Sequence, residues 1–139
     1  LAIAADTAQF STPGVHIGLF CSTPMVALSR NVADKHAMEM LLTGDMTSAA
    51  RAAEIGLVNR VVVPEALQEA TMEMARKIAS KSSMTLATGK SAYYAQREMT
   101  MADAYDYASG VMVDNMLAQD AREGIGAFIE KRAPLWQDA

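Results

Sequence analysis

The sequence has a single cysteine, Cys21, so an internal disulfide is excluded, and one thiol says little about the compartment. It contains no run of about 18 apolar residues, the length that a membrane-spanning helix needs. No basic segment precedes an apolar one, so these residues include no signal peptide. The two histidines, His16 and His36, lie far apart and lack a cysteine pair or third ligand, so we expect no metal site.

Basic residues are too few for a nucleic-acid-binding surface. Twelve lysines and arginines stand against sixteen acidic residues, which gives a net charge of −4. Hydrophobic residues make up 51% of the 139 residues, so the chain can bury a core and a single domain is expected. The eleven methionines are interpreted as flexible core filling, because a soft-metal site needs clustered sulfur ligands.

Three segments have the composition of β-strands, namely residues 1–5, 9–11 and 57–63. The first is wholly apolar, which is typical of a strand in the interior of a sheet. A sheet needs more strands than these segments provide. We therefore expect that a preceding part of the protein is missing from this sequence, and that these residues alone do not form a stable monomer.

Most of the remaining sequence is predicted to be helical. Ser22 or Thr23 is expected to cap the first helix, with Pro24 at its first position. Asp34 and Asp120 are expected to cap the second helix and the last. The predicted helices cover residues 24–31, 34–43, 49–55, 64–79, 84–99, 101–119 and 121–131.

The stretch from Ala8 to Arg30 is the first candidate for a functional site. It joins a strand to a helix through the turn Thr12-Pro13-Gly14, where proline fixes φ and glycine allows a positive φ. Ligands of α/β proteins often bind at such junctions, because backbone N–H groups there point outward. The alternative, which the local pattern favours, is a simple connection between strand and helix.

Few side chains in the sequence are candidates for chemistry. His16 could act as a general base or donate to a bound carbonyl, but with no orienting carboxylate in view a histidine held by the backbone is favoured. Cys21 would need a base to act as a nucleophile, and only His16 is near in sequence. Lys131 and Arg132 could meet a phosphate, although cations commonly end helices. No glycine-rich phosphate loop is present.

Several sequence blocks, taken together, point to a protein family more specifically than any one of them does alone. They are Ala8-Gln9-Phe10 with Pro13 and Gly18, Ala37-x-Glu39-Met40-x-Leu42-Thr43-Gly44-Asp45, Ala49 and Ala53 with Gly56-Leu57-Val58-Asn59-Arg60-Val61, Ala75 with Ile78-Ala79, Ser82 and Lys90, and Glu123-Gly124-x-x-Ala127-Phe128-x-Glu130-Lys131-Arg132. In this combination the whole chain resembles the enoyl-CoA hydratase/isomerase (crotonase) superfamily. The segment from Gly18 to Pro24 resembles in particular the domain-containing-protein-3 type of enoyl-CoA hydratase homologue.

The resemblance implies an α/β, crotonase-like (ClpP/crotonase) fold, of which this chain would be the C-terminal half. Residues 1–63 would end the β-core, and residues 64–139 would form a helical region for oligomerisation and closure of the site. The expected partners are an acyl-CoA substrate and further copies of the chain in a trimer or hexamer, with no nucleic acid and no membrane. Coenzyme A would be part of the substrate, so no separate cofactor is expected, and the location would be mitochondrial or the bacterial cytoplasm.

The resemblance also implies a chemistry for the site. In the superfamily two backbone N–H groups stabilise the enolate of an acyl-CoA thioester, and in hydratases two glutamates activate the water. Both N–H donors and the first glutamate belong to segments that would precede Leu1. The second glutamate corresponds to Gly14, which cannot transfer a proton, and whether His16 or another acid compensates stays open. Phe128 and Lys131 match positions near the adenine and the 3′-phosphate of CoA.

Three functions are compatible with these residues. The first is an enoyl-CoA hydratase/isomerase, a lyase-type enzyme of fatty acid metabolism, although we expect the isolated chain to be inactive. The second is another enolate reaction, such as isomerisation or thioester hydrolysis. The third is an assembly or regulatory subunit that has kept the fold and lost the chemistry. The glycine at position 14 favours the second and third over a hydratase.

Overall fold

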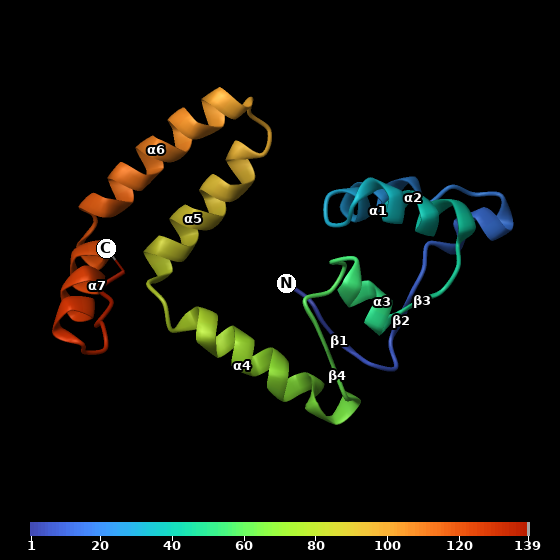
Figure 1. Cartoon of the computed structure of the whole chain (residues 1–139), viewed down its shortest axis with the longest axis horizontal. Helices are drawn as coiled ribbons and strands as arrows, with labels where there is room; N and C mark the ends of the chain where they lie inside the picture. Colours follow the sequence, from blue (N-terminus) through green and yellow to red (C-terminus); the bar gives the residue numbers. More distant parts are fainter. Residues whose placement is uncertain (139) are drawn as a thin grey trace. The chain divides into compact units, whose positions relative to one another are not determined.

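The computed structural model describes residues 1–138, and the chain divides into two compact units. The first unit comprises Leu1–Met74 and the second begins at Ala75, so the division falls inside helix α4 (Leu67–Ala79) (Figure 1). The sequence analysis assigned residues 1–63 to the β-core and residues 64–139 to oligomerisation and closure of the site. That assignment stays a prediction. Within residues 1–138 no helix is both long enough and apolar enough to cross a membrane.

The strands of the first unit form two small pairs. Strand β1 (Ile3–Ala5) runs parallel to β4 (Arg60–Val62), as Figure 1 shows. Strand β2 (Gln9–Phe10) is antiparallel to β3 (Thr47–Ser48), which the sequence analysis did not predict. A two-residue strand is too short to show an alternating pattern, so β3 is defined by its partner and not by its own residues.

Helices α1 (Ser22–Ser29) and α2 (Asp34–Thr43) have other N-cap residues than the sequence predicted. Cys21 precedes α1 as its N-cap, so Ser22 is the first helical residue and Pro24 the third, and the predicted cap was wrong. The N-cap of α2 is Ala33, so Asp34 lies in the first turn, where its carboxylate faces the positive end of the helix dipole. The helices are η1 (Pro13–Ile17), α1 (Ser22–Ser29), α2 (Asp34–Thr43), α3 (Ala49–Glu54) and η2 (Pro64–Ala66).

Two buried clusters hold the first unit together. One comprises Leu28, Val32, Ala37, Met40 and Leu41, and the other comprises Ala4, Ala49, Ala52 and Val58. Phe10 and Leu57 pack against both clusters, so they join the helices α1 and α2 to the strands. Met40 fills the core as predicted, but seven other methionines are exposed, so core filling does not explain them: Met38, Met46, Met72, Met99, Met101, Met112 and Met116.

The second unit is helical. Helices α5 (Ser83–Gln96) and α6 (Met101–Leu117) form an antiparallel hairpin, seen in Figure 1, and α7 (Gln119–Glu130) follows. The hydroxyl groups of Ser82 and Thr100 cap α5 and α6 by accepting the N–H groups of Thr85 and Asp103. No residue of α5 or α6 is fully buried, and many of the large apolar side chains of the hairpin are exposed.

Asp120 does not cap the last helix, because Ala118 occupies that position. Its side chain is instead buried, with 1% exposed, and accepts the backbone N–H groups of Gln137 at 2.7 Å and Asp138 at 3.0 Å. The hydroxyl of Ser82 also bonds to this carboxylate and, together with the two backbone donors, lowers the pKa of Asp120. Asp120 therefore holds residues 133–138, which we call the C-terminal strap.

Two further contacts attach the C-terminal strap. The carboxylate of Glu123 accepts two bonds from the guanidinium of Arg132, at 2.6 and 3.0 Å, and the N–H of Leu135 at 2.8 Å. The indole N–H of Trp136 donates to the carbonyl of Ser80 at 2.9 Å. A Cβ at Gly124 would lie 3.3 Å from the Trp136 ring, so this glycine gives the ring room to pack.

We expect Glu123→Gln to reduce the fall in the melting temperature that occurs when the pH is lowered. Hydrogen bonds from Arg132 and Leu135 lower the pKa of Glu123 from 4.5 to about 2. The native pKa lies below the unfolded one, so the stabilisation is complete above about pH 4.5 and is lost as the pH falls toward 2. Melting temperatures measured by circular dichroism at pH 6 and pH 3 should differ less for this variant than for wild type. Glu98→Gln serves as the control, and parallel profiles for all three proteins would contradict the prediction.

Candidate functional site

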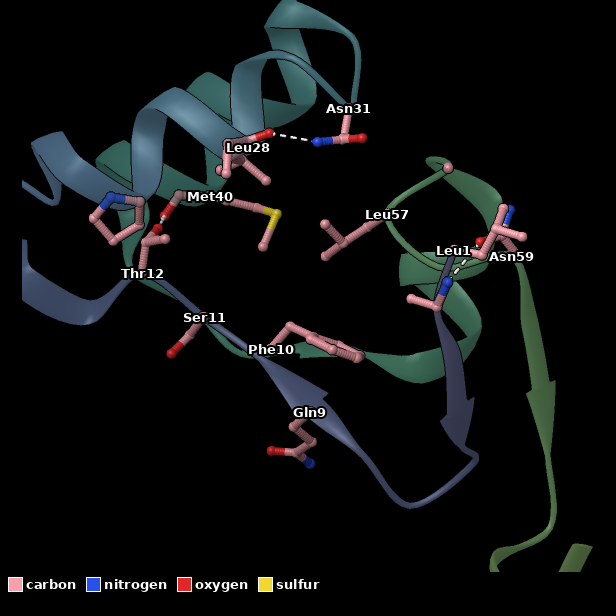
Figure 2. Close-up of a pocket in the computed structure, with 14 residues that line it drawn as sticks. Leu1, Gln9, Phe10, Ser11, Thr12, Leu28, Asn31, Met40, Leu57 and Asn59 are labelled. Carbon is pink, nitrogen blue, oxygen red and sulfur yellow. Dashed lines mark hydrogen bonds between the residues drawn. The ribbon is translucent and has the colours of Figure 1, made fainter. Parts of the chain in front are cut away.

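A hollow in the first unit lies between strand β2, helices α1 and α2, and the turn that precedes β4 (Figure 2). Its volume is about 740 Å³. Met40 and Leu57 point into the same space, with Phe10 beside them, as Figure 2 shows. The lining residues are Leu1, Ala2, Gln9, Phe10, Ser11, Thr12, Pro24, Ala27, Leu28, Asn31, Met40, Gly56, Leu57 and Asn59.

Three polar side chains of the hollow are engaged with the backbone. Thr12 donates to the carbonyl of Met40 at 2.8 Å, and Asn31 donates to the carbonyl of Ala27 at 2.8 Å. Asn59 accepts the N–H of Ala2 at 2.7 Å through its side-chain oxygen. None of the fourteen lining residues has an ionisable side chain. The hollow can therefore receive a neutral or apolar group, but its side chains cannot transfer a proton.

Gly14 lies in η1 and not on this hollow. Its N–H donates to the sulfur of Cys21 at 3.3 Å, and its carbonyl accepts the N–H of Leu19 at 2.9 Å. A Cβ built at this position would lie 2.6 Å from the Leu19 carbonyl oxygen and 2.8 Å from the Cys21 sulfur. Both distances are shorter than van der Waals contact allows, so the local backbone has no room for a side chain here.

His16 bridges η1 and the end of α2. Its Nε2 donates to the carbonyl of Thr43 at 2.9 Å, one of the last carbonyls of that helix, which have no partner inside it. The adjacent Gly44 ends α2 with a φ of +67°, and a Cβ there would lie 2.8 Å from Nε2 of His16. This geometry fits a histidine held by the backbone, one of the two interpretations that the sequence left open.

Phe128 and Lys131 belong to the second unit and do not line the hollow. Phe128 is 84% exposed on α7. Helix α7 ends at Glu130 and not at residue 131, as the sequence had suggested. Lys131 is its C-cap, in the left-handed conformation with a φ of +55°, where glycine is the usual residue. Both side chains are exposed, so they are available to a ligand.

A second hollow, of about 310 Å³, lies between α2 and α3 and was not predicted as a site. Arg51 donates to Nδ1 of His36 at 3.3 Å and to the carboxylate of Glu54 at 3.0 Å. The i,i+3 spacing of His36 with Glu39 and of Arg51 with Glu54 is the sequence signal for this cluster. Its charged groups are largely exposed, so each pair contributes little free energy.

The fold and its sequence are those of a known family. The model of the enoyl-CoA hydratase/isomerase family matches residues 1–139. The chain therefore belongs to the enoyl-CoA hydratase/isomerase family, which confirms the resemblance. Over 136 residues it is 50% identical to the mouse protein "Enoyl-CoA hydratase domain-containing protein 3, mitochondrial", and the match covers 98% of this chain and 45% of that protein.

Solved structures give the same result for the fold. The chain superposes on an enoyl-CoA hydratase of Mycobacterium smegmatis with a TM-score of 0.94 and 48% identity, covering 98% of this chain and 53% of that one. For human enoyl-CoA hydratase domain-containing protein 3 the TM-score is 0.93 and the identity 49%, with 98% and 54% covered. The predicted crotonase fold is thus confirmed, and the chain spans about half the length of the relatives it matches.

Proposed function

We propose that this chain supplies the C-terminal part of an acyl-CoA site in which an enolate forms on a thioester and is stabilised by backbone N–H groups. The observation that carries the proposal is the match to the enoyl-CoA hydratase/isomerase family over residues 1–139. The oxyanion donors and the first glutamate would come from segments that correspond to the rest of the relatives' length. The activity is accordingly proposed for a complete assembly and not for these residues alone.

The geometry of the first unit supports binding of a neutral group. The 740 Å³ hollow is lined by apolar side chains and by amides and hydroxyls, with no ionisable side chain among the lining residues. An acyl chain or a thioester fits such a lining better than the phosphates of CoA do. The exposed aromatic and cation at the end of α7, Phe128 and Lys131, are the proposed contacts for the adenine and the 3′-phosphate.

A second candidate is a catalytically impaired assembly or regulatory subunit of the same family. The observation that favours it is Gly14, which stands at the proposed position of the second glutamate and has no room for a side chain. His16, the nearest ionisable alternative that the sequence offered, is bonded to the Thr43 carbonyl. Isomerisation and thioester hydrolysis remain compatible with the site, since neither need use an acid at position 14.

The proposed assembly is a homo-oligomer, a trimer or a hexamer. Its support is the set of apolar side chains exposed on helices α5 to α7, among them Tyr94, Tyr105, Met112, Met116 and Ile129. Large exposed apolar surfaces mark association sites. The proposed location is mitochondrial or, for a bacterial protein, cytoplasmic, and the names of the vertebrate relatives include the word mitochondrial.

Lys131→Ala tests the proposed CoA contact. In the complete assembly we expect the variant to bind CoA about two- to fivefold more weakly, the loss typical of one exposed charge contact. Binding of dephospho-CoA, which lacks the 3′-phosphate, should change less. Isothermal titration calorimetry with both ligands gives the two affinities.

Lys77→Ala is the matched control, because Lys77 is an exposed lysine of the second unit on another helix. Its affinities should equal those of wild type. If Lys131→Ala weakens both ligands equally, or neither, Lys131 is not the phosphate contact. If wild type binds neither CoA nor acyl-CoA, the proposed function itself fails.

A further inference from the structure

The C-terminal strap is bound to the second unit largely through its backbone. It has no secondary structure of its own, and the N–H groups of residues 135, 137 and 138 donate to the carboxylates of Glu123 and Asp120. The residues that contact the strap include Ser80, Ser83, Asp120, Glu123 and Gly124, which we call the strap slot. All of them belong to the second unit. The slot therefore holds the strap much as a protein holds a bound peptide.

Two side chains of the strap make specific contacts with the slot. Trp136 donates its indole N–H to the carbonyl of Ser80 at 2.9 Å, and its ring packs over Gly124. The carboxylate of Asp138 accepts the N–H of Ser83 at 2.8 Å. Ser83 is the first residue of α5, so its N–H has no acceptor inside the helix. Together with the backbone contacts, these two side chains make the slot selective for the pattern Trp-x-Asp.

The connection between α7 and the strap is short and strained. It runs from Lys131 to Pro134 and contains no glycine. Lys131 has a φ of +55°, in the left-handed region, which costs free energy in a residue with a Cβ. Short connections under strain favour exchange of the attached segment between copies of a chain, because opening the connection relieves the strain.

Another copy of the chain can make the same contacts with the strap. The hydrogen bonds to the slot are made by residues 135–138, beyond the connection. Arg132, inside the connection, bonds to Glu123 of the slot, so this pair too can form between copies. Leu135 is 70% exposed, so burial of this large apolar side chain does not fix the strap to its own chain.

We propose that the strap slot is a peptide-recognition site and that its second occupant is the strap of another copy of this chain. Reciprocal exchange places each strap in the slot of the other copy and closes as a twofold pair. The strain relieved at Lys131 favours the exchanged pair, whereas the lost translational freedom of the two copies opposes it, so the exchanged fraction rises with protein concentration. Exchange of the strap needs no acyl-CoA, so its test is independent of the proposed function.

Two complementary variants of the full chain test the exchange. Asp120→Ala has a defective slot and an intact strap, whereas Trp136→Ala has an intact slot and a defective strap. In isotope-labelled Asp120→Ala protein alone, the amides of residues 137 and 138 should exchange freely with solvent. An excess of unlabelled Trp136→Ala protein should slow this hydrogen exchange by about tenfold or more, because only the slot of another copy can hold the labelled strap.

The double variant Asp120→Ala/Trp136→Ala, added in place of Trp136→Ala, is the matched control. It keeps the exposed apolar side chains of α5 to α7, so it separates strap exchange from association through those helices. It should leave the hydrogen exchange of the labelled strap unchanged. Exchange that is slowed equally by both added proteins, or by neither, would overturn the proposal.

A peptide gives the decision in wild type if circular dichroism shows that either single variant is unfolded. A peptide of residues 132–139 should bind to the wild-type chain, where it competes with the chain's own strap. The same peptide with alanine in place of both Trp136 and Asp138 should bind about tenfold more weakly or worse. Isothermal titration calorimetry measures both affinities. Equal affinities, or no binding of either peptide, would show that the slot does not recognise a strap from outside its own chain.

Discussion

Replacing Asp120 with alanine is expected to release the C-terminal strap and to lower the melting temperature by about 10 °C or more. The carboxylate is buried and accepts the N–H groups of Gln137 and Asp138 as well as the hydroxyl of Ser82. Alanine removes the acceptor of all three donors. One of them, the hydroxyl of Ser82, belongs to a buried residue, and an unsatisfied buried polar group is costly. Circular dichroism gives the melting temperature, and hydrogen exchange at residues 137 and 138 reports the release.

Two further variants make this result interpretable. Asp120→Asn keeps one side-chain oxygen as an acceptor, so its melting temperature should lie between those of wild type and the alanine variant. Asp114→Ala removes an exposed carboxylate from α6 and should have little effect. If the Asp120→Ala and Asp114→Ala variants have the same melting temperature, and the amides of the strap stay protected from hydrogen exchange, Asp120 does not hold the strap.

Leu41→Ala is expected to lower the free energy of unfolding by about 3 kcal/mol, within the range for a buried leucine. Leu41 is 1% exposed and lies in the cluster with Leu28 and Met40. Truncation removes its apolar contacts and leaves a cavity between α1 and α2. Equilibrium unfolding in urea measures the change.

The adjacent Leu42 is a matched control on the same helix. It is 60% exposed, so Leu42→Ala should change the free energy of unfolding by less than about 0.5 kcal/mol. Helix propensity is the same for both changes, which leaves burial as the difference between them. Equal losses at positions 41 and 42 would show that the cluster does not stabilise the first unit as described.

Much of the helical structure could be predicted from local pattern. Helix α2 spans residues 34–43 as predicted, because its apolar periodicity is clear and Gly44 ends it in the left-handed conformation. Helix α6 begins at the predicted residue 101, and the other ends of α5, α6 and α7 differ from the predictions by one to three residues. Two short elements were missed. Strand β3 is defined by hydrogen bonds to β2, a partner that a local pattern does not contain, and η1 is a single stretch of five residues without a helical repeat of apolar residues.

The candidate site depended more on tertiary structure. The resemblance identified position 14, but the atoms that close it belong to Leu19 and Cys21, whose approach follows from the turn between η1 and α1. The bond from His16 to the Thr43 carbonyl spans 27 residues, a distance over which no sequence pattern pairs residues. Asp120 had the appearance of a helix cap, because residue type and spacing do not reveal burial beneath a returning chain end.

The packing of Trp136 against Gly124 gives the protein a built-in optical probe. Trp136 is the only tryptophan of the chain, so fluorescence excited selectively at tryptophan comes from this one residue. Its ring lies over Gly124 and its indole N–H bonds to the Ser80 carbonyl, so detachment of the ring would expose it to water and shift its emission to longer wavelength. The fluorescence of the unmodified protein therefore reports on one end of the chain in real time, without an attached label.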